Sequence, residues 1–83
     1  MSGHPLVIVE WSDILSISDW RDFEDVLTDK PVSCVTAGFL VRDDRELVVV
    51  AATISNDDGH EGVGDTVAIP RGVVKKITRI TKK

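Results

Sequence analysis

The segment VSCVTAGFLVRDDRELVVVAATIS, residues 32–55, decides the fold class of this chain. Its first half alternates as a strand does, and one face carries four apolar residues, Val35, Ala37, Phe39 and Val41. A short charged stretch, residues 42–45, interrupts the pattern before a continuous apolar run resumes over residues 46–55. Two β-rich runs joined by a short charged turn predict a β-hairpin at the centre of the fold.

The second strand of this hairpin is apolar on both faces. Leu47, Val49 and Ala51 share one face, and Val48, Val50 and Ala52 share the other. A strand of this kind is covered on both sides, as in a closed barrel or a subunit interface. Because small barrels also tend to bury leftover strand edges by pairing with copies of themselves, we expect a homo-oligomer.

The C-terminal stretch IPRGVVKKITRI, residues 69–80, ends on a basic run that could be helix or strand. Its apolar residues Val74, Ile77 and Ile80 recur every three positions, which taken alone suits a helix. However, six of the nine residues from 73 to 81 are Val, Ile or Thr, and β-branched residues favour strands. We therefore predict a last strand that is strongly coiled or bulged, which would give the three-residue spacing.

Three more elements are expected around this framework. Residues 5–11, PLVIVEW, predict a first strand, and residues 66–69 predict a short strand that Pro70 ends. Between the hairpin and that short strand, residues 56–65 combine three glycines with four acids, and this composition predicts a turn-rich loop.

One helix is expected, over about residues 19–28. Trp20, Phe23 and Leu27 fall at helical spacing, with Val26 beside them. Ser18 is a suitable N-cap residue for this helix.

These elements predict a mostly β fold: a five-stranded, strongly bent antiparallel sheet that closes into an SH3-like small barrel, with one short helix. Eighty-three residues form a single domain, 1–83, with flexible ends at about 1–4 and 81–83. The single cysteine, Cys34, rules out an internal disulfide, and no apolar run is long enough to span a bilayer. We therefore expect a soluble, cytoplasmic protein with no membrane partner.

The charges are unevenly distributed along the chain. The net charge is −4, yet residues 66–83 contain no acid and six bases, Arg71, Lys75, Lys76, Arg79, Lys82 and Lys83. This segment either neutralises acidic elements of the same chain or a neighbouring subunit, or forms an anion-binding strip.

The sequence offers no catalytic or metal-binding pattern. Its only histidines are His4 and His60, and neither they nor Cys34 fall at the spacing of a zinc site. Cys34 falls in an apolar strand, where a free cysteine is usually a small hydrophobic residue. We expect no enzyme, no metal site and no cofactor.

Several short motifs resemble those of small uncharacterised proteins encoded by tailed phages and prophages. They are Trp11-Ser12-Asp13, Trp20, Gly38-Phe39-Leu40, Ala52-Thr53 and Ile69-Pro70-Arg71-Gly72. The last of these also resembles the turn that opens the final strand of Sm-like proteins. The resemblance implies an accessory phage or prophage protein in the cytoplasm of a bacterial host, and it brings no catalytic residues.

The candidate contact residues are aromatic and basic: Trp11, Trp20, Arg71, Lys75 and Arg79. The two tryptophans either cap the end of the barrel, or one stays exposed and stacks on a ligand beside Arg71 or Arg79. The leading function is a non-enzymatic binding module that occupies a host protein or sequesters a small, nucleotide-like anionic ligand. The alternatives are an oligonucleotide-binding Sm-like barrel that uses the basic C-terminal strand, and a structural virion component.

Overall fold

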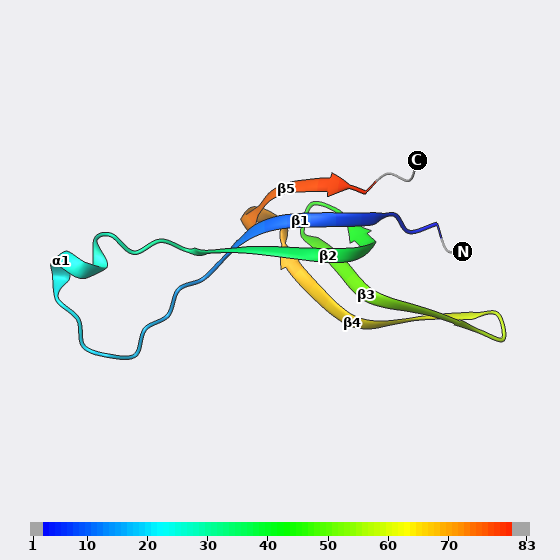
Figure 1. Ribbon diagram of the computed structural model, residues 1–83, viewed down its shortest axis with the longest axis horizontal. Helices are drawn as coiled ribbons and strands as arrows, with labels where there is room; N and C mark the ends of the chain where they lie inside the picture. Colours follow the sequence, from blue (N-terminus) through cyan, green and yellow to red (C-terminus); the bar gives the residue numbers. More distant parts are fainter. Residues whose placement is uncertain (1–2, 81–83) are drawn as a thin grey trace.

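Five antiparallel strands form one sheet in the order β4-β3-β2-β1-β5 (Figure 1). The computed structural model describes residues 3–80; the expected flexible ends therefore fall partly, at residues 1–2 and 81–83, outside the described residues. The elements are β1 (Leu6–Asp13), α1 (Phe23–Val26), β2 (Val32–Asp43), β3 (Leu47–Asp57), β4 (His60–Pro70), the 3-10 turn η1 (Arg71–Val73) and β5 (Val74–Arg79). The predicted mostly β fold with five antiparallel strands and little helix is confirmed.

The sheet is open, so the prediction of a closed barrel is wrong. Closure would require β4 to pair with β5, and these strands are instead the two edges of the sheet within residues 3–80. The β3–β4 ladder continues outward as far as the pair Asp57 and His60, which carries much of β4 away from the other strands (Figure 1). β5 has only six residues and pairs with β1 alone.

The central hairpin is confirmed, and the face of β2 that meets the core opposite β1 is not the one that carries Val35 and Ala37. Val35 is 70% exposed, whereas Cys34 and Thr36 on the other face are half-buried. In the β1–β2 register, Thr36 lies opposite Val9, which is fully buried, and opposite residues share a face. The small or polar residues of β2 therefore face the core, while Val35 and Ala37 face solvent.

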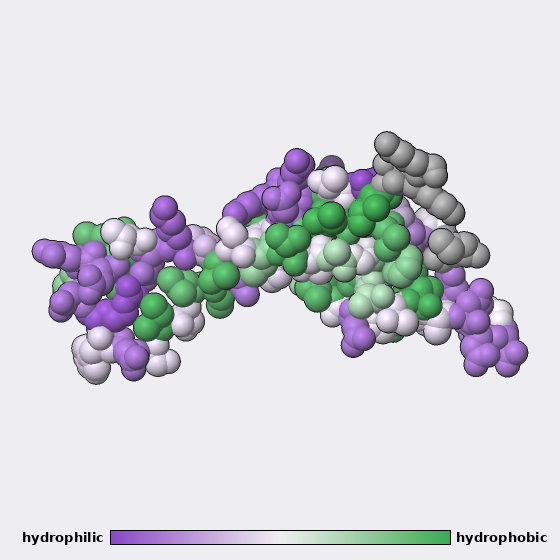
Figure 2. Space-filling view, viewed as in Figure 1, coloured by the Kyte–Doolittle hydropathy of each residue, from purple (hydrophilic) through white to green (hydrophobic). Residues whose placement is uncertain are grey.

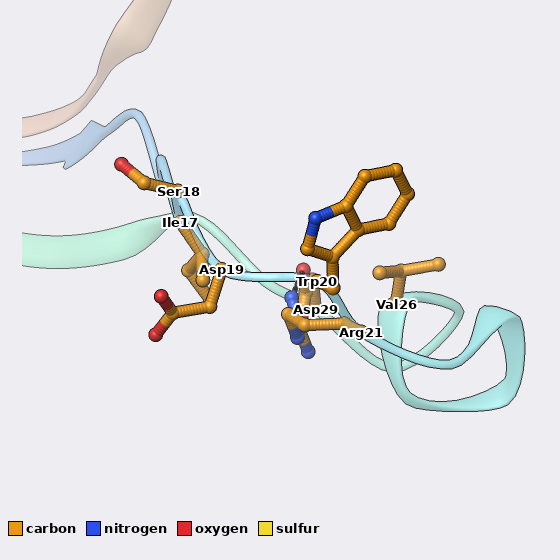
Figure 3. A pocket seen from close by; sticks show the side chains of 7 residues that line it. All are labelled: Ile17, Ser18, Asp19, Trp20, Arg21, Val26 and Asp29. Atoms are coloured by element: carbon orange, nitrogen blue, oxygen red, sulfur yellow. Dashed lines mark hydrogen bonds and ion pairs between the residues drawn. The ribbon is translucent and has the colours of Figure 1, made fainter.

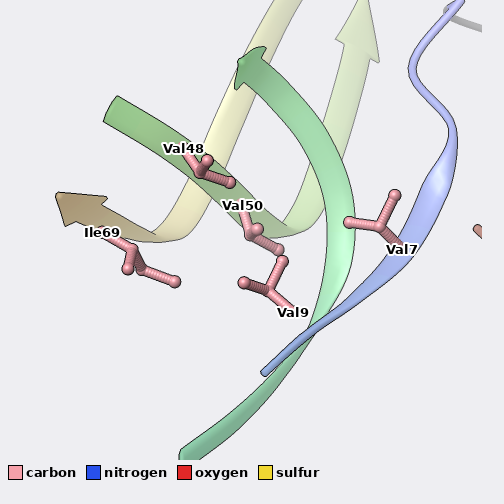
Figure 4. Packing of buried hydrophobic residues seen from close by; sticks show 5 residues of the cluster. All are labelled: Val7, Val9, Val48, Val50 and Ile69. Atoms are coloured by element: carbon pink, nitrogen blue, oxygen red, sulfur yellow. The ribbon is translucent and has the colours of Figure 1, made fainter. Parts of the chain in front are cut away.

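The core lies between the two halves of the bent sheet. Val7 and Val9 of β1 pack with Val48 and Val50 of β3 and with Ile69 of β4. Figure 4 shows Val9 and Val50 pointing toward one another across the bend. All five are at most 1% exposed, and no polar or charged side chain among the described residues is buried with them.

Gly38 allows β2 to bend tightly over this core. A Cβ atom at this position would lie 2.5 Å from the backbone oxygen of Ala51 and 2.8 Å from Cγ1 of Val50. A backbone oxygen in a strand cannot move without disturbing the ladder, so only glycine fits. A bulge that follows between Leu40 and Arg42 adds to the bend.

The last strand is a bulged strand, as predicted. Its pairing with β1 shifts register between Glu10 and Trp11, because Glu10 lies opposite Lys76 and Trp11 opposite Val74. The extra residue, Lys75, allows Val74 and Ile77 to pack on the same core despite their three-residue spacing.

Residues 56–65 are not a loop but the tip of a long hairpin. β3 runs to Asp57 and β4 starts at His60, so only Asp58 and Gly59 form the turn. Both have positive φ, 51° and 80°, as the tight turns that join twisted strands require. The predicted short strand at 66–69 is consequently the second half of β4, and it ends at Pro70 as expected.

The predicted helix over 19–28 is reduced to one turn, α1. Its N-cap residue is Asp22 rather than Ser18, and the flanking residues have no regular structure. The reason is that no surface faces the predicted apolar side: residues 14–31 project away from the sheet (Figure 1). A helix of this length depends on tertiary packing for its stability.

The close approach at Gly38 can be tested by substitution. We expect Gly38→Ala to lower the free energy of unfolding by about 1–3 kcal/mol, because the added methyl group overlaps the Ala51 carbonyl and Val50. The matched control is Gly72→Ala, where an added Cβ meets nothing within 4 Å. Urea unfolding followed by circular dichroism measures both; equal effects of the two substitutions would contradict the packing argument.

Candidate functional site

The most exposed apolar side chains of the molecule lie on the segment between β1 and β2, residues 14–31, which we call the arm. Trp20 is fully exposed, and Phe23 and Leu27 are 88% and 82% exposed. Ile14 is 80% exposed at the base of the arm. Large apolar side chains gathered on one projecting segment are typical of a protein-interaction site.

The arm keeps its shape through contacts at its tip. Arg21 donates two hydrogen bonds to the carboxylate of Asp29, at 2.6 and 2.8 Å, and a third, at 3.3 Å, to the backbone oxygen of Asp25. This guanidinium holds the pKa of Asp29 below its usual range, chiefly by hydrogen bonding. The planar, two-point contact ties the two ends of the tip together across α1.

A shallow hollow of about 460 Å³ lies beside Trp20 on the arm (Figure 3). Its lining includes Arg21 together with the carboxylates of Asp19 and Asp29. Because Arg21 is already paired with Asp29, the hollow has a net negative character, which suits a small anionic ligand poorly. Figure 3 shows the indole of Trp20 standing clear of the chain at its rim.

Trp11 is part of the packed sheet. Its Nε1 donates a hydrogen bond of 2.9 Å to Oγ1 of Thr36, and its ring packs against the core. Of the two arrangements expected for the tryptophans, the structure has the one in which a single ring stays exposed: Trp11 packs on the core, and Trp20 is exposed on the arm.

Arg71 joins the turn before β5 to the turn between β2 and β3. Its guanidinium forms an ion pair with Asp43 and donates a 3.1 Å hydrogen bond to the backbone oxygen of Asp44. Its own backbone N–H donates to the oxygen of Glu46 at 2.9 Å. The guanidinium of Arg71 is therefore engaged in contacts within the fold.

Asp44 organises that β2–β3 turn. Its Oδ1 accepts hydrogen bonds from the backbone N–H groups of Glu46 and Leu47, at 2.8 and 2.9 Å, and Oδ2 accepts one from Arg42. The bond from Arg42, followed by the two backbone bonds, lowers the pKa of Asp44 from 3.8 to about 2.

The remaining predicted contact residues lie on β5. Lys75, at the bulge, donates a 3.0 Å hydrogen bond from Nζ to Oγ of Ser33, and Arg79 lies opposite Val7. The structure does not bring Trp20 near Arg71 or Arg79: the lining of the hollow beside Trp20 contains neither, and the arm and β5 lie apart in Figure 1. The predicted site that combines a ring with one of these arginines is not formed.

Sequence reasoning did not name Phe23 and Leu27 as contact residues because it used them only as evidence for a helix. The residues around them indicated that the segment is exposed, because residues 19–29 include five acids. Such a density of charge around a short apolar stripe is more typical of a solvated segment.

No other chemical site is evident in residues 3–80. They contain no group of three or more His, Cys, Asp or Glu side chains that could hold a metal ion. Nor does this part of the chain contain a helix of the length and apolarity needed to cross a membrane.

The lowered pKa of Asp44 predicts that the stability of the fold depends on pH. A carboxylate whose pKa falls from 3.8 to about 2 on folding stabilises the native state above about pH 4, and this contribution is lost as the pH falls toward 2. We expect Asp44→Asn to melt at a lower temperature than the wild type at neutral pH, with the gap closing between pH 4 and pH 2. Thermal melts across this range test it, with Asp57→Asn as the control; a gap independent of pH would contradict it.

The two tryptophans should differ in fluorescence. Trp20→Phe leaves only the half-buried Trp11, so we expect blue-shifted emission with weak acrylamide quenching. Trp11→Phe leaves only the exposed Trp20, so we expect red-shifted emission with strong quenching. Similar quenching of the two variants would mean that the arm folds back onto the protein.

Comparisons with protein-family models, with curated proteins and with solved structures found no match to this chain.

Proposed function

We propose that this chain is a non-enzymatic binding module that occupies a partner protein through the arm. The single observation that carries the proposal is the arm itself, which holds Trp20, Phe23 and Leu27 outside the core. Aromatic anchors of this kind contribute most of the binding energy when they enter a pocket on a partner.

The charges of the arm indicate which kind of partner would be complementary to it. Residues 14–31 contain five acids and two bases, a net charge of −3. Of the two bases, Arg21 is paired within the arm with Asp29. A complementary partner has an apolar groove for the rings and a basic rim for the acids.

This geometry favours a protein partner over a small nucleotide-like ligand. The hollow beside Trp20 is shallow and lined by carboxylates, whereas ligand pockets usually enclose most of the ligand surface. Arg71 and Lys75, expected to contact an anion, make contacts within the fold instead. Those contacts also leave the oligonucleotide alternative with fewer free bases.

We retain the proposal that the protein is a phage or prophage accessory protein acting in the bacterial cytoplasm. It rests on the resemblance of the short motifs, such as Ile69-Pro70-Arg71-Gly72. A distant relationship to SH3-like folds is also proposed; the bent central hairpin and the tight turn before the last strand support it. A virion role would instead engage the strand edges β4 and β5.

The arm proposal is tested by paired capture and titration. Tagged wild-type protein, the double variant Trp20→Ser/Phe23→Ser and the control Val63→Ser are isolated gently from cells that express them. Val63 is an apolar residue that is 53% exposed on the β3–β4 hairpin, away from the arm. The partner of interest is retained by the wild type and the control and lost by the double variant.

With that partner purified, we expect the double substitution to weaken binding by about 30-fold or more, as for the loss of a buried aromatic anchor. Isothermal titration calorimetry measures the change. Equal affinity of all three proteins would contradict the proposal. So would native mass spectrometry showing a co-purified small molecule that both the wild type and the double variant retain.

A further inference from the structure

The sheet has a second apolar face, opposite the core. Val7 and Val9 point into the core, so the alternate β1 residues Leu6 and Ile8 point to the other side. Phe39 lies opposite Leu6 and Ala37 opposite Ile8, so these two share that side. With Val35 and Ile80 they form what we call the outer face: Leu6, Ile8, Val35, Ala37, Phe39 and Ile80.

The outer face is continuous across three strands and open to solvent. Ile80 donates its backbone N–H to the oxygen of Leu6 at 2.9 Å, which places it beside β1. Leu6, Val35 and Ile80 are 42%, 70% and 50% exposed. Figure 2 shows hydrophobic surface gathered over β1, β2 and β5. An antiparallel sheet with one solvated face normally carries polar residues there, so this face is unusual.

The charges on the outer face are self-complementary. Glu10 and Lys76 lie opposite each other on β1 and β5, on the same side of the sheet as Ile8. Val35 lies opposite Glu10 on the other flank of β1, so the acid and the base border the apolar residues. A two-fold axis can place Glu10 of one copy against Lys76 of the next, and the reverse.

From these exposed apolar residues and this charge pattern we infer that the outer face is a symmetric dimer interface, and that its occupant is the outer face of a second copy of the chain. Two sheets pack face to face through their apolar residues, and the bordering pair of charges sets their relative orientation. The arms remain free at either side of the dimer, so the dimer presents two copies of the proposed partner-binding segment.

The first test is the mass of the protein in solution. We expect sedimentation equilibrium under reducing conditions to give a dimer at tens of micromolar, and Val35→Lys to weaken it by at least about tenfold because it buries an unpaired charge. Val63→Lys, an equally polar change at an exposed valine outside the outer face, should leave the dimer intact. A monomeric wild type, or equal effects of the two lysines, would overturn the inference.

The second test separates contacts between copies from contacts within one. Glu10→Lys and Lys76→Glu each create a like-charged pair inside their own chain, whether the chain is alone or paired. Mixing them restores opposite charges only across the interface. Random pairing of an equimolar mixture gives as much heterodimer as the two homodimers together. We expect this ratio to rise roughly threefold, to about 3:1, in native mass spectrometry with one variant labelled with ¹⁵N. Random pairing would overturn the inference, and this test holds even if Val35→Lys fails to fold.

A third variant tests whether the outer face and the arm act separately. Trp20→Ser/Phe23→Ser should remain a dimer while it loses the partner protein. If it becomes monomeric instead, the arm makes the contact between copies. The outer-face inference then fails, while Trp20 and Phe23 of the arm remain implicated in binding.

Discussion

The bend of β2 over β3 at Gly38 is the constraint on which the rest of the structure depends. β2 is the only strand that pairs both with β1 and with β3, so it must belong to both halves of the sheet. The 2.5 Å that would separate a Cβ at Gly38 from the Ala51 oxygen shows how closely the strands approach there. That approach brings Val7 and Val9 over Val48 and Val50, and it makes one face of the sheet a core. The other face is left without cover.

The small core explains why the arm can be so exposed. The described residues bury five large aliphatic side chains almost completely, and none of them comes from the arm. The arm therefore adds little to the stability of the sheet, and its sequence is free to serve another purpose. Its tip is held by the local Arg21–Asp29 pair rather than by the core. Folding and the proposed binding thus depend on separate parts of an 83-residue chain.

The strands could be predicted from the sequence because β-branched runs and Pro70 mark them locally, and even the bulge at Lys75 followed from the spacing of Val74 and Ile77. Other features depend on tertiary contacts. The inner face of β2 was missed because Gly38 and Thr36 look unlike core residues until the bend and the Trp11 hydrogen bond are known. The Asp58-Gly59 turn was visible in the sequence, but the surrounding glycines and acids obscured it. The arm was missed because helical spacing says nothing about whether a surface exists to pack against.

The basic segment is engaged by the fold in part. Arg71 forms an ion pair with Asp43, Lys75 donates to the neutral hydroxyl of Ser33, and Lys76 lies opposite Glu10 in the strand register. The Arg71–Asp43 pair therefore neutralises one of the four bases in the described part of the segment. In the arm the acids outnumber the bases, because residues 14–31 contain five acids and two bases. Because the field at a projecting segment is set mainly by its own charges, the arm approaches a partner as an acidic, aromatic surface. The net negative charge of the arm fits the basic partner proposed for it, whereas the balanced pair Glu10 and Lys76 on the sheet fits the proposed dimer.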